Sequence, residues 1–534
     1  MRVYLETFGC QMNELDSELV RSNLLSLGYS FVDRPDDASV ILFNTCSVRE
    51  QAEQKAWSRI GIVGQRKKAG EKLILGVLGC MAERDGLDML RRHPQVDILC
   101  GPGELDRLPH LLGNMRSITD DRPARADRVA LAGNSNRRTA TLEAAQDGLE
   151  ALDLSRSFDP AHSLAGKASA YVRITRGCNK FCTYCVVPHT RGAEVHRPPD
   201  HIVDECKRLA DQGVIEVTLL GQTVNHYRYT HGRALTIEGL ELPQVGPGLS
   251  AFRTPLGGAS AGSGAAGDRT TTFADLLFRI HEEVPALQRI RFVTSYPRDF
   301  SDEALKVMAQ SPRICPYLHA PAQSGSDRIL KLMNRGYTVT QYLEFVDRAF
   351  KIVPDLSLAG DFIVGFPTET DADFEATCDL VRRVPFKNNF IFKYSPRPGT
   401  VAYDRIPDDV PDEVKRWRNN RLLAIQSERS AEVHASWVGR TLPVFFQDTR
   451  SIRRAPIAAG AALVGATIEG LAPATQPAPE VNGIGSWQAI GRTAGDLIVA
   501  VPAATVADAD ALVGSIRLVR ITESGDLLLK GQFA

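Results

Sequence analysis

Three cysteines lie close together in the segment AYVRITRGCNKFCTYCVVP, as Cys178, Cys182 and Cys185. A structural zinc site normally has four ligands, and no fourth cysteine or close histidine completes a set here, since His189 follows Pro188 in a new segment. Three thiolates leave one metal position open, which suits a [4Fe–4S] cluster that also binds a small molecule. We therefore predict such a cluster, with zinc or buried thiols as the alternatives.

The segment before residue 118 alternates short apolar stretches with helix-like ones, which predicts a parallel α/β sheet. The expected strands are Val3–Thr7, Val40–Phe43 and Leu73–Leu78. Each leads into a cysteine, and these are Cys10, Cys46 and Cys80. Ligands bind beyond the carboxyl ends of strands in open parallel sheets, so we expect the three thiols to converge at one edge.

The residues beside these cysteines favour a metal site over the alternative of buried small apolar side chains. Gly9, Asn44 and Gly79 precede or flank the thiols, and such residues suit tight turns and close backbone approach. The sequence thus predicts a second three-thiolate site. The remaining cysteines show no such repetition and are expected in the core: Cys100, Cys206, Cys315 and Cys378.

A repeated strand, loop and helix pattern begins near residue 167. The expected strands are Tyr171–Thr175, Val217–Leu220, Arg291–Thr294, Tyr317–His319, Asp361–Val364 and Phe390–Tyr394. Six such units indicate a parallel, partly open barrel, whose active site lies at the carboxyl ends of the strands. The polar loop residues expected there are Cys178, Gly221, Gln222, Ser295, Gln323, Ser324, Gly325 and Gly365.

Composition is that of a large water-soluble enzyme. The 534 residues suggest about three domains. The chain has 63 Lys plus Arg and 64 Asp plus Glu, so its net charge does not indicate a polyanionic partner. Ten cysteines without a secretory signal favour metal or redox chemistry over disulfides. No segment approaches the length of a membrane span. We expect a cytoplasmic protein without a membrane partner.

The expected domain organisation is α/β throughout, with a small antiparallel β-barrel at the end. We expect residues 1–118 to form the sheet domain, 119–166 to be a linker that carries some helix, and 167–436 to form the partial (β/α)6 barrel. A low-complexity insertion at about 227–272 is expected to be a disordered surface segment. Residues 437–534, with strands such as TLPVFFQ and SIRLVRI, form the β-barrel, interrupted by a loop at about 455–483.

A charged helical segment, KRWRNNRLLAIQSERS, precedes the β-barrel. It places Lys415, Arg416, Arg418 and Arg421 around Trp417. Such a run is usually a solvated face, and RNA contact is the alternative function.

The chain resembles the methylthiotransferase family of radical S-adenosylmethionine (SAM) enzymes over nearly its full length. Tyr184 fills the slot before the last cysteine of the C-x3-C-x2-C motif, where that superfamily has an aromatic residue. The supporting stretches are TFGCQMNELDSE, NTCSVRE, GCMAER, RGCNKFCTYCVVPHTRG, LLGQTVN, QSGSDRILKLMNRGYT, DFIVGFPTET and YSPRPGT. Within the family, GCQMN and LLGQ-x-VN are most similar to the branch that acts on N6-dimethylallyladenosine in tRNA.

The resemblance implies two [4Fe–4S] clusters and SAM. The cluster of Cys178, Cys182 and Cys185 would bind and cleave SAM to an adenosyl radical, and that of Cys10, Cys46 and Cys80 would hold the sulfur methylated by a second SAM. The product would be a methylthio group on C2 of the adenosine at position 37, next to the anticodon. Expected SAM-site residues are Tyr184, Gly221, Gln222, Gln323, Ser324 and Gly365.

The resemblance also implies a C-terminal TRAM domain that holds the tRNA anticodon stem-loop, and we expect Arg440, Arg492 and Arg520 to contact its phosphates. A low-potential electron donor such as flavodoxin or ferredoxin is implied, and a monomer is expected. Alternatives are a methylthiotransferase that acts on threonylcarbamoyladenosine or on a ribosomal protein, and a non-catalytic iron–sulfur RNA-binding protein.

Overall fold

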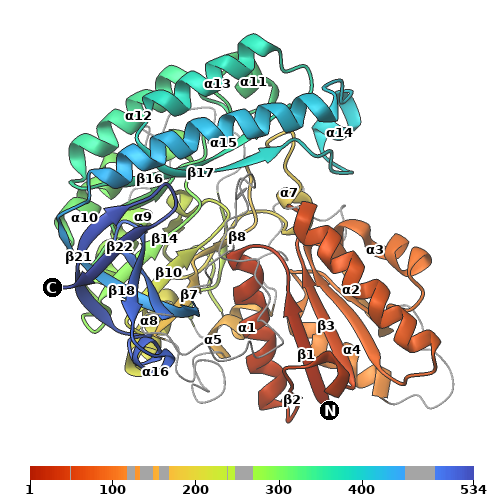
Figure 1. Ribbon diagram of the computed structural model, residues 1–534. Coiled ribbons are helices and arrows are strands. Elements are labelled where there is room, and N and C mark those ends of the chain that lie inside the picture. The colour runs from red at the N-terminus through yellow and green to blue at the C-terminus, as the bar shows by residue number, and fades with distance from the viewer. Residues whose placement is uncertain are drawn as a thin grey trace. The chain divides into compact units, whose positions relative to one another are not determined.

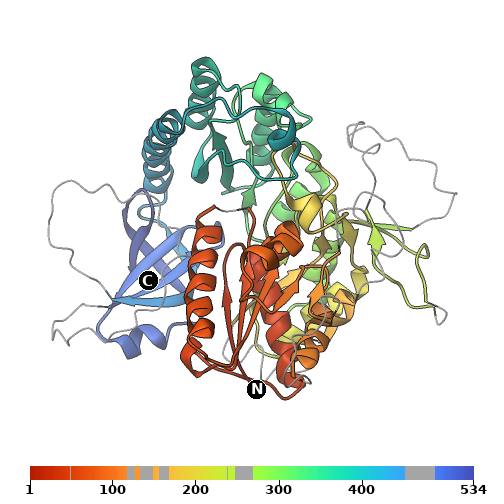
Figure 2. The ribbon, with the colours of Figure 1, turned by 90° about the vertical axis from the view of Figure 1, so that its right-hand side faces the viewer.

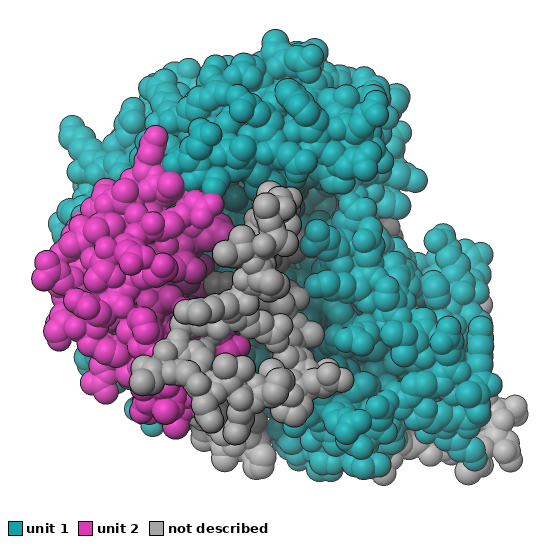
Figure 3. Space-filling model, viewed as in Figure 1, with its two compact units in different colours: residues 1–429 teal, residues 430–534 magenta. Residues whose placement is uncertain are grey.

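The structure is a computed structural model that describes residues 1–48, 50–116, 127–132, 148–155, 168–236, 239–246, 269–451 and 487–534. The chain forms two compact units, residues 1–429 and residues 430–534 (Figure 3). The larger unit contains both the sheet domain and the partial barrel. Among the described residues, no helix is long and apolar enough to cross a membrane.

The N-terminal sheet has six parallel strands in the order β2-β1-β3-β4-β5-β6 (Figure 1). The strands are β1 (Arg2–Thr7), β2 (Ser30–Phe31), β3 (Val40–Thr45), β4 (Ile74–Gly79), β5 (Ile98–Cys100) and β6 (Val129–Ala130). All six residues of β3 are buried, as expected for a central strand covered on both faces. The predicted parallel sheet is confirmed.

Helices cover both faces of this sheet (Figure 1). One apolar cluster combines the sheet with α1 (Gln11–Ser26) and α4 (Leu108–Arg116). The other combines it with α2 (Glu50–Lys68) and α3 (Cys80–Arg92). The helices bury the two faces of β3 and leave its carboxyl end, before Cys46, as the natural position for a site.

The stretch expected to be a linker, 119–166, does not simply connect two domains. Val129 and Ala130 form β6, which pairs with β5, and helix α5 (Leu149–Ser155) packs through Leu149 and Leu152 on the cluster that contains α1. Some helix was expected in this stretch, and α5 provides it. Strand β6 was not expected, because it is only two residues long and too short to show a hydrophobic period. Residues 119–126, 133–147 and 156–166 lie outside the described residues.

The partial barrel consists of two three-stranded parallel sheets, β14-β10-β7 and β15-β16-β17. Their strands are β7 (Ser169–Arg173), β10 (Glu216–Leu220), β14 (Arg289–Phe292), β15 (Tyr317–His319), β16 (Ser357–Val364) and β17 (Phe386–Lys393). A parallel bridge between Ile290 and Ile314, and a hydrogen bond from Ser295 N to His319 O of 3.0 Å, join the two sheets. The six predicted strands are confirmed.

Helices follow these strands, and hydroxyl groups fix where several of them begin. They are α8 (Pro199–Asp211), α9 (Phe273–Glu283), α10 (Asp302–Gln310), α11 (Asp327–Leu332), α12 (Val339–Ile352) and α13 (Asp371–Arg383). Thr272, Thr338 and Thr370 each form a capping box with the third residue of the helix. These caps fix the first residue of each of the three helices, and Thr370 thereby ends the loop that connects β16 to α13.

The segment at about 227–272, expected to be a disordered insertion, is ordered at both ends. β11 (Arg228–Thr230) pairs with β13 (Thr270–Thr272) and β12 (Gln244–Val245) pairs with β9 (Val195–His196). The buried rings of Tyr227 and Tyr229 join the barrel core. The low-complexity composition is confined to the middle, and residues 237–238 and 247–268 lie outside the described residues.

The second unit is a closed five-stranded barrel in the order β18-β19-β20-β22-β21 (blue in Figure 2). Its strands are β18 (Thr441–Ser451), β19 (Trp487–Thr493), β20 (Ile498–Ala503), β21 (Ile516–Ser524) and β22 (Leu529–Phe533), with the short helix α16 (Val506–Asp510). The predicted β-barrel is confirmed, although β20 and β22 pair in parallel. The expected loop at 455–483 lies outside the described residues.

Candidate active site

Cys178, Cys182 and Cys185 occupy one loop beyond the strand β7. The loop turns sharply, because Gly177 has φ +70° and Phe181 has φ +50°. A Cβ at Gly177 would lie 1.9 Å from Ala193 O, so only glycine fits there. The backbone N–H of Lys180 donates to Cys178 Sγ at 3.4 Å, and Thr223 Oγ1 lies 3.7 Å from the same sulfur. The strand end and its turn thus place the sulfurs at the predicted face of the barrel.

Burial favours the protonated form of two of these thiols, Cys178 and Cys185. Burial raises the pKa of Cys178 to about 12, and the nearby Glu194 carboxylate adds to this rise. Burial also raises the pKa of Cys185, and the charges of Cys182 and Cys178 raise it further. Metal ligation by cysteine requires the thiolate and therefore releases protons. The mutual electrostatic effects show that the three sulfurs lie near one another.

The guanidinium of Arg335 lies against this loop, and sequence reasoning missed it. Its Nη1 donates to Cys182 Sγ and to Tyr184 Oη, both at 3.4 Å, and the group lies over the ring of Tyr296 at 4.7 Å. Arg335 is 5% exposed. A buried cation at this position can stabilise an anionic thiolate cluster. Tyr184, predicted as a site residue, lies within this contact set.

Cys10, Cys46 and Cys80 converge at one edge of the N-terminal sheet, as predicted. Cys46 follows β3 directly, Cys80 follows β4 directly, and Cys10 stands immediately before α1. A hydrogen bond between Cys46 and Cys10 lowers the pKa of Cys10 and raises that of Cys46. Burial raises the pKa of Cys80, and the charge of Cys10 adds to it. The parallel register alone brings these distant positions together.

The flanking residues hold the strand ends close together. Gly9 lies against Cys46, where a Cβ would be 2.4 Å from Cys46 Cβ, and Gly79, with φ +86°, lies against Asn44, where a Cβ would be 2.4 Å from Asn44 Oδ1. The buried side chain of Asn13 donates to Asn44 Oδ1 at 3.1 Å. Glycine and asparagine here serve close approach, as expected from the sequence.

One short segment joins the two cysteine sets. Helix α7 (Val187–Thr190) begins two residues after Cys185. Arg191, next along the chain, donates to Asn13 Oδ1 at 3.3 Å and to Asp16 Oδ2 at 2.8 Å. Its positive charge lowers the pKa of Cys10, although burial and the Cys46 hydrogen bond affect that thiol more. The chain leaving one set therefore ends beside the other.

The number of thiols in each set suits a cluster. Structural zinc normally takes four protein ligands, and each set has three cysteines. Among the described residues, no group of three or more His, Cys, Asp or Glu side chains is arranged to hold a single metal ion. Three cysteine ligands are also the set that leaves one iron of a [4Fe–4S] cluster open.

Three strand ends beside the first cysteine set carry buried polar atoms with no hydrogen-bond partner among the described residues. They are Thr175 Oγ1, Gln222 Oε1 and Ser295 Oγ. Buried polar groups are normally paired, so such atoms require an explanation. They follow β7, β10 and β14, and they fit a polar small molecule such as SAM. Gly221 lies against Thr175, where a Cβ would be 2.1 Å from Oγ1.

The remaining predicted SAM-site residues lie at the ends of β15 and β16. Gln323, with φ +74°, bridges to Phe362 of β16. Ser324 Oγ is 3.3 Å from Thr377 Oγ1 and accepts from Ser326 N at 3.2 Å. Gly365 has φ +69°. Ser324 is thus occupied in holding its own loop, and its expected contact with SAM stays a prediction.

The charged run at 415–421 was expected to be a solvated face, but only part of it is exposed. Lys415 and Arg418 in helix α15 (Asp412–Ala435) are 2% and 3% exposed, whereas Trp417 is 60% exposed. Both cations bind carboxylates, with Lys415 Nζ 2.6 Å from Asp408 Oδ2 and Arg418 Nη1 2.8 Å from Glu369 Oε2. A helical stripe with Leu422 and Ile425, both buried, could have revealed this face.

Comparisons with known proteins agree with this geometry. Residues 172–381 match the Radical SAM superfamily, and residues 2–101 match Uncharacterized protein family UPF0004. The chain is 42% identical over 448 residues to a tRNA-2-methylthio-N(6)-dimethylallyladenosine synthase of Rhodopirellula baltica, covering 83% of each chain. It is 38% identical to the same enzyme of Syntrophotalea carbinolica, covering 83% of this chain and 88% of that one.

A solved structure of a radical SAM methyltransferase from Kitasatospora setae, TsrM, aligns with a TM-score of 0.46 at 14% identity, over 75% of this chain and 77% of that one. The family assignment depends on the two sequence relatives, each of which the chain covers over more than four-fifths of its length. This protein belongs to the family of tRNA-2-methylthio-N(6)-dimethylallyladenosine synthases, which are radical SAM methylthiotransferases.

Proposed function

We propose that this protein adds a methylthio group to C2 of N6-dimethylallyladenosine next to the anticodon of tRNA, using SAM and two [4Fe–4S] clusters. Membership of the family supports the reaction and the substrate. The second cluster, the residues that hold each cluster and the position in the tRNA are parts of the proposal.

In this proposal Cys178, Cys182 and Cys185 hold the cluster that binds SAM. A [4Fe–4S] cluster with SAM supplies a hydrogen abstractor strong enough for an unactivated aromatic C–H, which no side-chain acid or base provides. Arg335 balances the negative charge of the thiolates through its contact with Cys182. Thr175, Gln222 and Ser295 bind polar groups of SAM, because their buried oxygen atoms have no partner within the described chain.

Cys10, Cys46 and Cys80 hold the second cluster and with it the sulfur to be transferred. The observation that carries this assignment is the short path between the two sets: the residue after α7 binds Asn13, whose Oδ1 also accepts from Cys10 Sγ at 3.4 Å. Holding the sulfur near the reacting carbon makes its transfer effectively unimolecular, and proximity of this kind is worth several orders of magnitude in rate.

The C-terminal barrel is proposed to bind the anticodon stem-loop in the manner of a TRAM domain. Arg440 and Arg520 are exposed, and Arg440 stacks on Trp437 at 4.3 Å. Arg492 pairs with Asp496 at 2.7 Å, so its role with phosphate requires that this pair rearrange. A low-potential donor such as flavodoxin or ferredoxin, a monomeric state and a cytoplasmic location complete the proposal.

Two experiments test the proposal. Nucleoside mass spectrometry of tRNA from cells with and without the gene should show 2-methylthio-N6-dimethylallyladenosine only with the gene. The anaerobic protein should hold about eight irons as two four-iron clusters, and with SAM and dithionite it should release 5′-deoxyadenosine. Zinc in place of iron, or unchanged tRNA in the deletion strain, would contradict it.

A further inference from the structure

The loop from Gly365 to Glu369 connects the carboxyl end of β16 to α13 and is folded around a buried carboxylate. The side chain of Glu369 is fully buried, and it accepts from Gly365 N at 2.5 Å. The carboxylate thereby closes the loop on itself. Gly365 is one of the residues expected to contact SAM, so the shape of this loop bears on the SAM site.

Helix α15 holds this loop from one side through Arg418. Its Nη1 donates to Glu369 Oε2 at 2.8 Å and to Glu369 O at 3.0 Å, and its Nη2 donates to Asp371 Oδ1 at 2.7 Å. One guanidinium thus binds a side chain, a backbone carbonyl and the first residue of α13. This planar, multidentate arrangement is specific to arginine.

Lys415, one turn earlier in α15, lies across Gly365. A Cβ at Gly365 would be 2.4 Å from Lys415 Cγ, and Gly365 has φ +69°. The Lys415 ammonium binds both oxygens of Asp408, at 2.7 and 2.6 Å. Its aliphatic stem is therefore fixed against the loop backbone and cannot swing away without breaking that pair.

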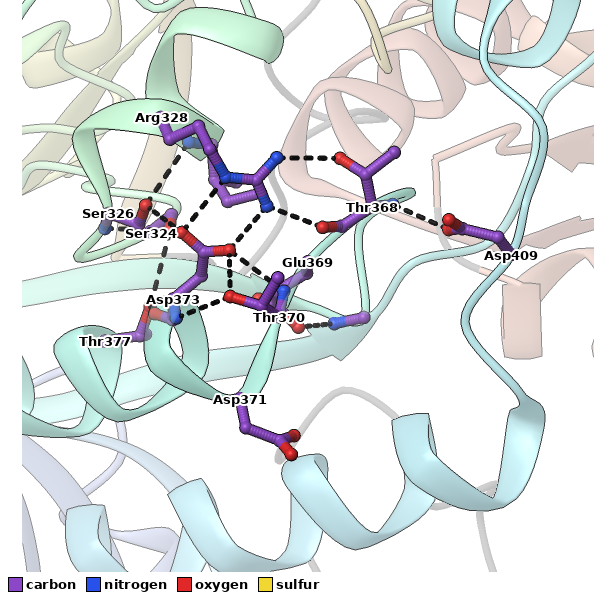
Figure 4. Close-up of polar contacts among 12 residues, drawn as sticks. Ser324, Ser326, Arg328, Thr368, Glu369, Thr370, Asp371, Asp373, Thr377 and Asp409 are labelled. Carbon is purple, nitrogen blue, oxygen red and sulfur yellow. Dashed lines mark hydrogen bonds and ion pairs between the residues drawn. The ribbon is translucent and has the colours of Figure 1, made fainter.

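A separate network holds the same loop from α11 (Figure 4). Arg328 donates to Thr368 Oγ1 at 3.1 Å and to Thr368 O at 2.5 Å, and Asp409 Oδ1 accepts from Thr368 N at 2.7 Å. Thr368 has φ +69°, a strained conformation for a β-branched residue. Such conformations persist where the surroundings over-determine them, and they cluster at ligand-binding loops.

The chemistry of the α15 contacts indicates that they serve geometry more than stability. A buried ion pair adds little stability compared with apolar packing, because both charges lose their hydration. Glu369 Oε1 and Arg418 Nε are also buried with no hydrogen-bond partner among the described residues, and leaving such atoms unpaired lowers the stability of the fold. What the pair provides is a defined position for Glu369 and hence for Gly365.

We propose that Arg418 and Lys415 of α15 are positioning residues that hold the Gly365–Glu369 loop in the conformation that binds SAM. The inference rests on the proposed SAM site. It assigns a function in SAM binding to two cations that do not themselves touch the cysteine sets.

The ionisation of Glu369 provides an independent readout. Burial raises the pKa of Glu369 to about 7, although the Gly365 N–H and Arg418 lower it and Asp373 raises it further. The charged groups around it are Arg418 from α15, Asp371 and Asp373 from α13 and Arg328 from α11. Protonation near pH 6 weakens the hold of Arg418, so SAM should bind more weakly at pH 6 than at pH 8.

The test compares SAM dissociation constants of the anaerobically reconstituted full chain. R418Q should raise Kd for SAM by about 10–100-fold. R418K should raise it by less, and K415M by a factor between those of R418K and R418Q. KM for SAM should rise in parallel, whereas kcat at saturating SAM should change much less. R382Q is the matched control, because Arg382 also pairs with two carboxylates, Glu375 and Asp379, but on the surface of α13; it should bind SAM as the wild type does.

Wild-type SAM affinity in R418Q and K415M would overturn the inference. If R418Q fails to fold or to hold iron, the E369Q variant tests the inference instead, because it keeps the shape of the Glu369 side chain and removes its ionisation. E369Q should lose the difference in SAM affinity between pH 6 and pH 8, and an unchanged pH dependence would also overturn the inference. A wild type that binds SAM but leaves tRNA unmodified would contradict the proposed function alone, whereas one that binds no SAM would contradict both.

Discussion

The two cysteine sets are built in opposite ways. Cys178, Cys182 and Cys185 share one loop, whose shape depends on two local backbone turns at Gly177 and Phe181. Cys10, Cys46 and Cys80 come from three separate strand ends, which meet only when β1, β3 and β4 align in parallel. The loop set therefore depends on local conformation, and the other set depends on the folding of a whole sheet.

This difference separates the two proposed steps of the reaction. A site on one loop can form without the neighbouring domain, whereas a site at a sheet edge is lost with the sheet. Each set can consequently be removed without its ligands disturbing the other. Removing either set should therefore abolish one step of the reaction and leave the other intact.

Replacing Cys178, Cys182 and Cys185 with Ala should abolish SAM cleavage, because the cluster that is proposed to bind SAM is lost. Release of 5′-deoxyadenosine under dithionite should fall to background, and iron should fall from about eight to about four per chain. The remaining iron, observed by electron paramagnetic resonance, would belong to the sheet-edge set. Continued SAM cleavage by this variant would show that the loop is not the SAM site.

Replacing Cys10, Cys46 and Cys80 with Ala should have the reciprocal effect. SAM should still be cleaved, because the ligands of the loop set are intact, but the methylthio product should disappear from tRNA since the sulfur is no longer held near the substrate. Mass spectrometry of digested tRNA and of the small-molecule products measures both outcomes in one reaction. Full methylthiolation by this variant would make the three cysteines merely structural.

The same local and non-local distinction explains what could be predicted from the sequence. The spacing of Cys178, Cys182 and Cys185 is visible without a fold, and the strand patterns were regular enough to place Cys10, Cys46 and Cys80 at one edge. The side chains that complete the sites come from distant segments. Arg335 reaches Cys182 across 153 positions and Arg191 reaches Asn13 across 178, and no local pattern reports such contacts.

No strand was expected at the position of β19, whose interior contains Gly491. A Cβ at Gly491 would lie 2.5 Å from Phe445 O of the neighbouring strand β18. Glycine in this strand permits close approach of two backbones. Sequence reasoning cannot distinguish that role from a turn before the partner strand is known.

A smaller perturbation tests whether the sheet edge needs its tight packing. G79A should destabilise the sheet by at least about 1–3 kcal/mol and reduce iron at the Cys10, Cys46 and Cys80 set, since Gly79 has φ +86° and a Cβ would meet Asn44 and the Thr45 backbone. The free energy of unfolding in urea and the iron content after reconstitution measure this.

G70A provides the matched control, because Gly70 has φ +95° but nothing lies within 4 Å of its Cβ position. G70A introduces the same backbone strain but no steric clash. It should therefore lower the free energy of unfolding by less than G79A does, and it should leave the iron content unchanged. Equal losses of iron in G79A and G70A would show that strain alone, and not close approach at the strand ends, controls the site.

The smallest expected effect concerns the ionic network that joins the partial barrel to helices α1 and α5 beside the N-terminal sheet. Arg173 binds Asp16 of α1 at 3.3 Å and Asp153 of α5 at 2.9 Å, and Arg197 binds Glu150 of α5 at 2.8 Å. Burial alone would raise the pKa of Glu150, but the Arg197 charge and the hydrogen bonds from His201 and Arg197 outweigh it and lower the pKa to about 2. An unfolded Glu titrates near 4.3.

Because the pKa of Glu150 is lower in the folded chain, its contribution to stability is present above about pH 4.3 and is lost as the pH falls toward 2. E150Q should therefore be less stable than the wild type at pH 6, by about 1–3 kcal/mol, and the difference should shrink near pH 2.5. Urea unfolding of the full chain before cluster reconstitution measures it. E375Q is the control, since Glu375 is 57% exposed, and it should match the wild type at both pH values. A gap between E150Q and the wild type that persists at pH 2.5 would mean that the shape of this side chain, and not its charge, joins the two regions.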